Sequence, residues 1–349
     1  MSQRLQPHNF SNEGKSEECD ILVVYLILAH DNPDMLGRLI NALDSKQVHF
    51  FIHIDKKSDI RKFLPCIPEK QNVHLSENRV NVSWGGYSQV QATLNLMDEV
   101  LNSGIDFKYA ALLSGTHYPI KSNAYIFEKL SHSTCEYLQF CEVAEAGSEQ
   151  KINAYCLYDY ALFNPRATFS GNGLLNKVIR IPGAVVNRVL SKVIPIFYQR
   201  RLVRNITPYT GANWWTLTKP CIKYIIDYSK THKDYVDFFR FSIQPDETFF
   251  HTIICNSTFN IQNGDITLRD LTGRPARGGK FSKLRGLSLT YTKCSPIGDP
   301  KTLSIADLKE VSSELNYFGC PQLFARKFDP VVSRELIGKI DNDILGNTC

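Results

Sequence analysis

The chain has 349 residues, of which 43% are hydrophobic and 21% are charged. This length and composition are typical of a globular protein with a substantial core, and they exclude collagen-like, low-complexity and broadly disordered chains. The net charge of +5 is mild and does not by itself indicate a nucleic-acid partner.

The first 20 residues are polar and show no apolar face, so we predict that they form a flexible tail. The apolar run Ile21–Ala29 that follows is rich in β-branched residues and predicts a buried, parallel strand. It is far shorter than the about 20 residues that a membrane-spanning helix needs, and no signal-peptide pattern surrounds it.

Ten cysteines are spread along the chain, and none forms a Cys-x-x-Cys pair. This spacing disfavours a zinc site or thioredoxin-type chemistry. Because we also find no signal peptide, we expect a cytoplasmic protein with free thiols.

Strands and helices alternate through the first 120 residues. We predict strands at 21–29, 49–54, 73–75 and 109–113, a helix at Pro33–Leu43 capped by Asn32, and an amphipathic helix after the Trp84-Gly85-Gly86 turn with Val90, Leu94, Met97 and Leu101 on its buried face. This order predicts a mostly parallel α/β sheet with right-handed crossovers. Ligands of such sheets bind beyond the carboxyl ends of the strands.

The second half is less regular. We predict a strand at Trp214–Thr218, a helix at Lys219–Tyr228, a helix that opens at Gln244 and runs to about Cys255, and an exposed loop at Arg269–Lys283. We therefore expect one domain over residues 21–349, with a nucleotide-sugar half at 21–130 and an acceptor and catalytic half at 131–349.

Residues 160–226 contain no Asp or Glu but ten Lys and Arg residues. Such clustering produces a local positive field. It fits a solvated basic face, an anionic acceptor, a lipid-linked pyrophosphate or an anionic membrane. Residues 174–204 are a candidate amphipathic membrane segment, interrupted by Pro182, Gly183 and Pro195, which suggests peripheral contact with the inner face of the cell membrane.

Seven motifs occur in a fixed order and together carry a family resemblance. They are Tyr25-Leu-Ile-Leu-Ala-His30, Ile52-His-Ile-Asp-Lys-Lys-Ser58, Ser83-Trp-Gly-Gly-Tyr-Ser-Gln-Val-Gln-Ala92, Leu112-Leu-Ser-Gly-Thr-His-Tyr-Pro-Ile-Lys-Ser-Asn123, Asn213-Trp-Trp-Thr-Leu217, Pro245-Asp-Glu-Thr-Phe-Phe250 and Leu323-Phe-Ala-Arg-Lys-Phe328. Over residues 21–330 the chain resembles the core-2/I-branching β-1,6-N-acetylglucosaminyltransferases and the related peptide O-xylosyltransferases.

The resemblance implies a GT-A-like fold, a UDP-sugar donor, inversion at the anomeric carbon and no requirement for a divalent metal or other cofactor. We expect N-acetylglucosamine as the transferred sugar, with xylose as the alternative. Because no membrane anchor is apparent, the chain is more similar to a bacterial member that acts on a cell-surface glycan or a lipid-linked glycan precursor.

Displacement at an anomeric carbon needs a base for the acceptor hydroxyl and positive charge for the departing pyrophosphate. The resemblance places the base at Glu247, which we expect in the first turn of a helix, where the macrodipole favours its ionised form. Asp246 is expected to cap that helix or to orient Glu247 and contribute to acceptor binding.

The resemblance also assigns Lys327 to the leaving pyrophosphate in place of a metal. Lys301 is its best-matching assistant, and Arg326 is the fallback. Each of these cations has an ordinary alternative as a solvated surface group.

The sequence lacks the central Asp-x-Asp that metal-dependent GT-A enzymes use. Its only such pair, Asp341-Asn-Asp343, lies near the C-terminus and is expected to be a turn or helix start. His117 stands where the family usually has Asp, which puts any substrate contact by this residue in doubt.

The nucleotide is expected to lie across His30, Asp55 and Trp84, with Trp84 either stacking on the base or packing beside the Gly-Gly turn. Trp214 and Trp215 are adjacent, so on a strand they would point to opposite sides, one into the core and one toward the acceptor.

Two other classes compete with this interpretation. A non-catalytic carbohydrate- or lipid-binding module would not need Glu247. A nicotinamide-dependent oxidoreductase would need Gly-x-Gly-x-x-Gly after the first strand, where the chain has His30-Asp-Asn-Pro33.

Overall fold

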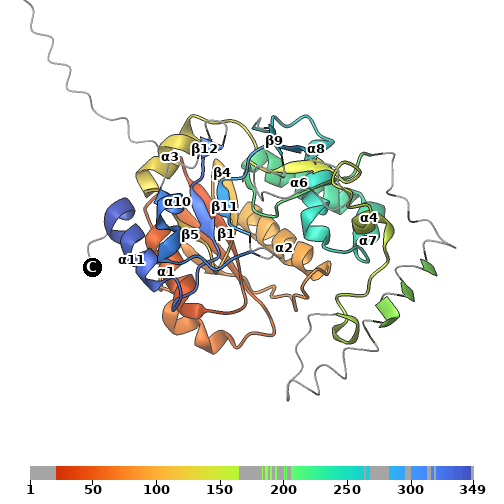
Figure 1. Cartoon of the computed structure of the whole chain (residues 1–349), viewed down its shortest axis with the longest axis horizontal. Coiled ribbons are helices and arrows are strands. Elements are labelled where there is room, and N and C mark those ends of the chain that lie inside the picture. Colours follow the sequence, from red (N-terminus) through yellow and green to blue (C-terminus); the bar gives the residue numbers. More distant parts are fainter. Residues whose placement is uncertain are drawn as a thin grey trace, which may run out of the picture.

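The computed structural model (Figure 1) describes residues 21–164, 206–262, 265–267, 283–294, 300–312, 316–317 and 320–346, with isolated positions between 183 and 202. The predicted tail 1–20, most of the basic segment 174–204 and nearly all of the loop predicted at 269–283 lie outside these residues.

A five-stranded sheet with the order β3-β2-β1-β4-β8 forms the centre of the molecule. Its strands are β1 (Val23–Ala29), β2 (Val48–Ile54), β3 (Val73–Leu75), β4 (Tyr109–Ser114) and β8 (Thr216–Thr218). The first four are parallel, and β8 is antiparallel to β4. The predicted α/β class with a mostly parallel sheet is confirmed.

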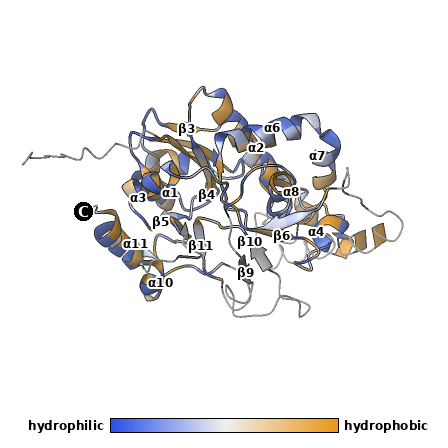
Figure 2. Ribbon diagram, turned by 90° about the horizontal axis from the view of Figure 1, so that it is seen from above, coloured by the Kyte–Doolittle hydropathy of each residue, from blue (hydrophilic) through white to orange (hydrophobic). Residues whose placement is uncertain are grey.

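Both faces of this sheet are covered, and the side chains of β1 alternate between them. Tyr25 and Ile27 pack with α1 (Pro33–Leu43) and α3 (Asn123–Ser131). Val24 and Leu26 pack on the other face with α2 (Ser88–Asn102) and α6 (Lys219–Thr231). This two-sided burial explains why the strand is apolar at every position rather than at every second one. Figure 2 shows the helices turning their apolar sides toward the sheet.

The boundaries of α1 agree with the sequence prediction, but the cap of α1 and the buried face of α2 differ from it in one residue each. Asn32 precedes α1, but it adopts a left-handed backbone conformation and its side chain makes no capping hydrogen bond. Leu101, expected on the buried face of α2, is only partly buried, whereas Val90, Leu94 and Met97 are buried.

Three smaller sheets accompany the central sheet. Within the described residues they are β11-β14-β5, β7-β6-β10-β9 and β12-β13. Their strands are β5 (Tyr118–Pro119), β6 (Phe140–Glu142), β7 (Tyr209–Gly211), β9 (Asp265–Thr267), β10 (Lys283–Arg285), β11 (Thr290–Thr292), β12 (Asn316–Tyr317), β13 (Cys320–Pro321) and β14 (Phe324–Arg326). Because β5 directly follows β4, its pairing with β14 brings residues 324–328 to the carboxyl edge of the central sheet.

The remaining elements are short. They are α4 (Gln150–Asn153), α7 (Lys233–Phe239), α8 (Phe249–Cys255), α10 (Leu308–Ser312), α11 (Arg334–Ile340), the 3-10 turns η1 (Ile60–Lys62), η2 (Leu64–Cys66), η3 (Ala161–Phe163), η5 (Pro245–Glu247) and η6 (Ile305–Asp307), and the π-helical turn η7 (Asp341–Leu345).

The predicted helix from Gln244 to Cys255 is interrupted, which is a correction to the sequence analysis. Pro245–Glu247 form the 3-10 turn η5, Thr248 leaves the helical region with φ −129°, and α8 begins only at Phe249. Glu247 therefore does not lie in the first turn of an α-helix, and the expected macrodipole effect does not apply to it. The predicted strand at Trp214–Thr218 is likewise shorter, covering Thr216–Thr218.

Arg200, part of the basic stretch, is buried rather than solvated. Its guanidinium donates to the carbonyl oxygens of Ala154, Phe238 and Phe241, the last over 3.2 Å. Arg200 therefore connects separate segments of the chain through hydrogen bonds, and it is not part of a solvated basic surface. No helix within the described part of the chain combines the length and the apolar character needed to cross a membrane.

Candidate active site

The carboxyl edge of the central sheet gathers most of the predicted site residues. Helix α2 begins at this edge, and two contacts tie the η5 turn to its start: Gln244 N donates to Gly85 O over 2.9 Å, and Gln89 Nε2 donates to Asp246 Oδ2 over 3.0 Å. On the β4 side of the same edge, Phe328 N donates to Thr116 O over 2.9 Å. Glu247 therefore lies near the start of α2, and Lys327 lies near the end of β4. Both positions are at the carboxyl edge of the central sheet.

Glu247 forms an ion pair with Lys151 of α4 through its Oε2 atom. Lys151 also donates to Thr210 Oγ1 of β7 over 3.0 Å, and its side chain is only 12% exposed. The Glu247 side chain is 33% exposed, so it remains open to solvent on one side. The ion pair therefore fixes the orientation of the Glu247 carboxyl group.

Asp246 lies beside Glu247 and is buried. Burial raises the pKa of Asp246 to about 7, and the neighbouring Glu247 charge adds to the increase. Of its two oxygens, Oδ2 accepts from Gln89, whereas Oδ1 has no partner among the described residues. Asp246 does not cap a helix. Its burial beside another carboxyl group makes ionisation of Asp246 less favourable than that of an ordinary aspartate.

The loop between β7 and β8 connects the Glu247 side of the edge to the Lys327 side. Thr210 of β7 contacts Lys151, and four residues later Trp214 lies under the guanidinium of Arg326 at 4.5 Å from its ring centroid. His117 contacts the same indole, with 4.6 Å between ring centroids. Arg326, Trp214 and His117 therefore form one cluster.

The two tryptophans have different environments, as predicted for adjacent residues. Trp215 is 1% exposed and packs against Phe250 of α8 with ring centroids 5.9 Å apart. Trp214 is only partly buried. Trp215 is therefore the core member of the pair, which leaves Trp214 as the candidate for acceptor contact.

Lys327 and Lys301 are backbone neighbours with different side-chain partners. Lys327 N donates to Lys301 O over 3.4 Å. The Lys301 ammonium donates to both carboxylate oxygens of Asp307, over 2.8 and 2.9 Å. The Lys301 ammonium is thus paired with the Asp307 carboxylate. The Lys327 side chain forms no ion pair within the described residues. Of these two lysines, Lys327 is the better candidate for a ligand.

The three residues assigned to the nucleotide lie along the same edge. Asp55 is buried, and its Oδ1 accepts from Lys57 N over 2.9 Å, which makes it a turn-stabilising residue in this structure. His30 is exposed and lies 3.6 Å from Asp31 Oδ2. Trp84 is 40% exposed beside the Gly85-Gly86 turn.

The turn that carries Trp84 depends on close backbone packing at Gly86. A Cβ atom there would lie 2.2 Å from Asp159 Oδ1, and Asp159 in turn accepts from Ser88 N over 3.1 Å at the start of α2. A glycine is therefore required at position 86 for the loop 155–164 to pack against this turn.

Asp341 and Asp343 lie in η7, the π-helical turn that follows α11, and Asp341 accepts from the Tyr118 hydroxyl over 2.7 Å. The Asp-x-Asp pair has the structural role that the sequence predicted. Within the described residues, no group of three or more His, Cys, Asp or Glu residues is arranged to hold a metal ion.

Sequence reasoning missed Lys151 and Gln89 as site residues. Lys151 is 96 positions from Glu247, and Gln89 is 157 positions from Asp246. Gln89 lies inside a motif that we had identified, but nothing in that motif indicates its partner. Lys151 lies in none of the motifs, so no local signal distinguished it from other surface lysines.

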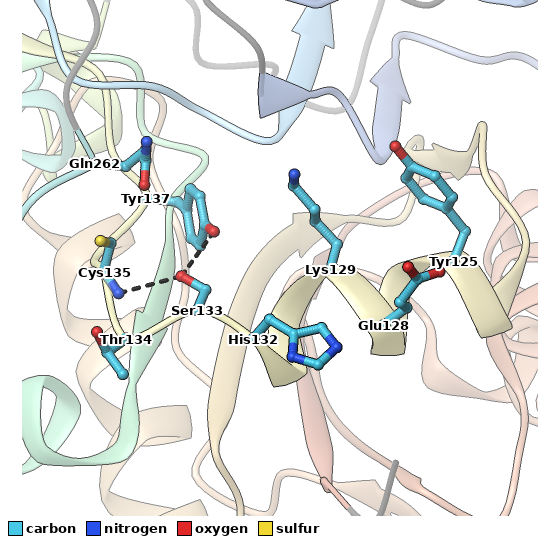
Figure 3. Close-up of a pocket in the computed structure, with 9 residues that line it drawn as sticks. All are labelled: Tyr125, Glu128, Lys129, His132, Ser133, Thr134, Cys135, Tyr137 and Gln262. Carbon is cyan, nitrogen blue, oxygen red and sulfur yellow. Dashed lines mark hydrogen bonds between the residues drawn. The ribbon is translucent and has the colours of Figure 1, made fainter. Parts of the chain in front are cut away.

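A polar pocket of about 430 Å³ lies at the opposite edge of the sheet (Figure 3). It is lined by α3 and by the segment after it, where Ser133 Oγ accepts from Tyr137 Oη over 2.8 Å and from Cys135 N over 3.2 Å. Tyr109, the first residue of β4, also reaches Ser133, over 3.1 Å. This pocket is at the amino ends of the strands and is separate from the cluster described above.

Comparison with known proteins identifies the family. The family model described as Core-2/I-Branching enzyme matches residues 23–285, more than half of the chain. The chain belongs to the core-2/I-branching enzyme family.

Individual relatives show which activities are found among similar proteins. The chain is 24% identical over 340 residues to xylosyltransferase 2 of Bos taurus and 23% identical over 338 residues to a xylosyltransferase of Ciona intestinalis, in alignments that cover 94% of this chain and 34% of each relative. It is 32% identical over 120 residues to a human β-1,3-galactosyl-O-glycosyl-glycoprotein β-1,6-N-acetylglucosaminyltransferase 3, which covers 33% of this chain and 27% of that protein. The chain spans about a third of the length of these curated relatives.

Proposed function

We propose that this protein is an inverting glycosyltransferase that moves a sugar from a UDP-sugar to a hydroxyl of a glycan acceptor. The observation that carries the proposal is the environment of Glu247: one oxygen is fixed by Lys151, and the side chain stays partly exposed. This arrangement provides a fixed and partly exposed carboxyl group at the edge of the sheet where ligands bind.

In the proposed mechanism, Glu247 accepts the proton of the acceptor hydroxyl as its oxygen attacks the anomeric carbon. The bond to the UDP oxygen breaks from the opposite side, which inverts the anomer. Lys327, with Arg326 beside it, stabilises the negative charge on the departing pyrophosphate. No step of this scheme requires a bound metal, because the fixed cations supply the charge.

Two observations point to different donor sugars. The local match to a β-1,6-N-acetylglucosaminyltransferase has the higher identity, which favours UDP-N-acetylglucosamine. The xylosyltransferase matches extend over nearly the whole chain, which favours UDP-xylose as the second candidate. Hydrolysis of each donor by the purified protein, measured in the presence of a chelator, would distinguish them.

We place the acceptor among cell-surface or lipid-linked glycans. The cluster of Lys and Arg between residues 160 and 226 supports an anionic acceptor or an anionic membrane nearby. A protein that does not sediment with anionic liposomes would rule out the membrane part of this proposal.

The central test is Glu247→Gln. This variant keeps the shape of the side chain and removes the base, so transfer is expected to fall by about 10²- to 10⁴-fold. UDP binding, measured by the thermal shift that UDP produces, is expected to remain. Full activity in Glu247→Gln would contradict the mechanism, and a thermal shift with NAD but not with UDP would contradict the class.

A further inference from the structure

A helical segment in the second half of the chain carries exposed valines on one side. The described positions between residues 183 and 194 have helical geometry. Among them, Val185, Val186, Val189 and Val193 are 54%, 38%, 50% and 40% exposed. Successive residues of an α-helix are about 100° apart around its axis, so these four lie within an arc of about 100°. They therefore form one apolar surface, which we call the valine face.

The opposite side of this segment is held to a neighbouring loop. Asn187 is buried, its Oδ1 accepts from Leu157 N over 3.0 Å, and its Nδ2 donates to Phe163 O. A Cβ atom at Gly183 would lie 1.6 Å from Leu162 O, so the backbone of the segment also contacts this loop closely. Because Gly183 and Asn187 lie outside the arc of the four valines, these contacts turn the valine face away from the loop.

The valine face reverses the usual pattern of a surface helix, whose apolar side packs on the core. An exposed apolar surface with polar residues around it marks a site where a protein or a membrane binds. Residues 160–204 contain eight Lys and Arg residues and no Asp or Glu. Apart from the buried Arg200, seven cationic residues therefore accompany the valine face in the sequence.

This charge distinguishes between the partners that could cover the valine face. A second copy of the chain would bring two basic stretches together across a two-fold axis, and like charges repel. An anionic lipid surface is complementary in both respects, because its headgroups are negative and the layer below them is apolar. The combination of valines and cations therefore fits a membrane better than it fits another copy.

The loop that holds this segment also contacts the candidate active site. Asn164 Nδ2 donates to Trp84 O over 3.0 Å, and Asp159 accepts from Ser88 N, at the start of α2, over 3.1 Å. The valine face and the carboxyl edge of the central sheet are thus connected through a single loop.

We propose that the valine face inserts into the headgroup region of an anionic membrane, while the basic residues of 160–204 bind the lipid phosphates. Docking in this way holds the carboxyl edge of the sheet close to the membrane surface. A glycan carried on a lipid is then within reach of Glu247. This last consequence rests on the proposed glycosyl transfer, and it narrows the acceptor to a lipid-linked glycan.

Sedimentation of the full chain with lipid vesicles tests the proposal. Vesicles of phosphatidylglycerol and phosphatidylcholine in equal parts are compared with vesicles of phosphatidylcholine alone. We expect roughly tenfold tighter binding or more to the anionic vesicles. High salt is expected to weaken this binding, because it screens the attraction between exposed charges.

Two pairs of substitutions locate the contact. Val185→Asn combined with Val189→Asn makes the valine face polar at nearly unchanged helix propensity. This pair is expected to weaken binding to the anionic vesicles by about tenfold or more and to leave donor hydrolysis in solution within about twofold of the parent. Val331→Asn combined with Val332→Asn makes the same change at two other exposed valines and is expected to keep the parent affinity for vesicles. Thermal melts show that each variant is folded.

Equal binding of the parent and the Val185→Asn, Val189→Asn pair would overturn docking by the valine face. Binding that does not depend on phosphatidylglycerol would overturn it as well, because the basic stretch would then have no role. A dimer in light scattering that this pair dissociates would assign the face to a second copy instead. A parent chain that binds the vesicles but hydrolyses no UDP-sugar would contradict the proposed function and leave the docking in place, and one that hydrolyses a UDP-sugar without binding vesicles would do the reverse.

Discussion

Lys151 and Glu247 form an ion pair between α4 and the η5 turn, and the lysine is the more buried of the two, at 12% against 33% exposure of the side chains. The pair is anchored at its far end by Thr210 of β7. The Lys151 side chain is nearly buried, whereas the Glu247 side chain is partly exposed to solvent. The ion pair therefore orients Glu247 without burying it. The ion pair thus connects the fold to the proposed base.

The first prediction concerns Lys151. Replacing it with Met leaves Glu247 without the group that fixes its orientation, so kcat is expected to fall by about 10- to 100-fold with little change in UDP affinity. Lys151→Arg is expected to restore part of the loss. Steady-state kinetics of donor hydrolysis or transfer would measure both.

The control for this series is Lys339→Met, at an exposed position of α11. Lys339→Met is expected to keep the kcat of the parent, because Lys339 makes no contact with Glu247. An unchanged kcat in Lys151→Met would show that Lys151 has no effect on the base.

The second prediction concerns the pH dependence of stability through Asp246. Its pKa is about 7 in the folded protein, against an ordinary value of 3.8. For a pKa that folding raises, the stabilisation is complete below the ordinary value and is lost as the pH rises through the folded value. Asp246 is therefore expected to destabilise the protein progressively between about pH 4 and pH 7.

Asp246→Asn keeps an oxygen that can accept from Gln89 but removes the titration. Relative to this variant, the parent is expected to become less stable from pH 5 to pH 8 in thermal melts recorded at each pH. Parallel Tm curves for the two proteins would show that Asp246 is already ionised in the folded state at low pH.

The third prediction separates the two neighbouring lysines. Lys327→Ala is expected to weaken UDP binding by about tenfold, since a charge-assisted contact to phosphate is lost. Lys301→Ala is expected to leave UDP affinity within about twofold and to reduce stability by on the order of 1 kcal/mol, because Lys301 neutralises Asp307 together with Lys293.

The reason for this difference lies in Asp307. Burial alone would raise the pKa of Asp307, but hydrogen bonds from Lys301 and Lys293 outweigh burial and lower it to about 2. Titration with UDP, followed by fluorescence or calorimetry, together with a denaturant melt of each variant distinguishes binding from stability. Equal losses of UDP affinity in both variants would assign Lys301 to the phosphate as well.

The fourth prediction concerns metal dependence. Treatment with EDTA followed by buffer exchange is expected to leave the rate of donor hydrolysis unchanged within about twofold, because Lys327 and Arg326 supply the charge that a metal would provide. Addition of manganese is expected to have no effect on the treated protein. Activity that returns only with manganese would contradict the proposed charge stabilisation.

Much of the fold could be predicted from the sequence because its signals are local. The run at Ile21–Ala29, the helix Pro33–Leu43 and the strand Val73–Leu75 agree with the structure within two residues. The helix predicted across Gln244–Cys255 was wrong at its start, because the chain leaves the helical region at Thr248 and packs η5 against α2. A contact made in the tertiary structure outweighed the local preference there.

The sequence by itself determined the strand–helix alternation, and hence the edge of the sheet at which ligands bind, because buried strands and amphipathic helices are specified by patterns only a few residues long. It also supplied the motifs that contain Glu247, His117 and Arg326. Only the tertiary structure decided that Lys151 meets Glu247, that Lys301 is taken by Asp307 and that Arg326 shares Trp214 with His117. The first and third of these contacts join residues far apart along the chain, and no local pattern encodes which distant side chain each will meet. Lys301 and Asp307 are only six positions apart, but their pairing depends on how the chain turns between them.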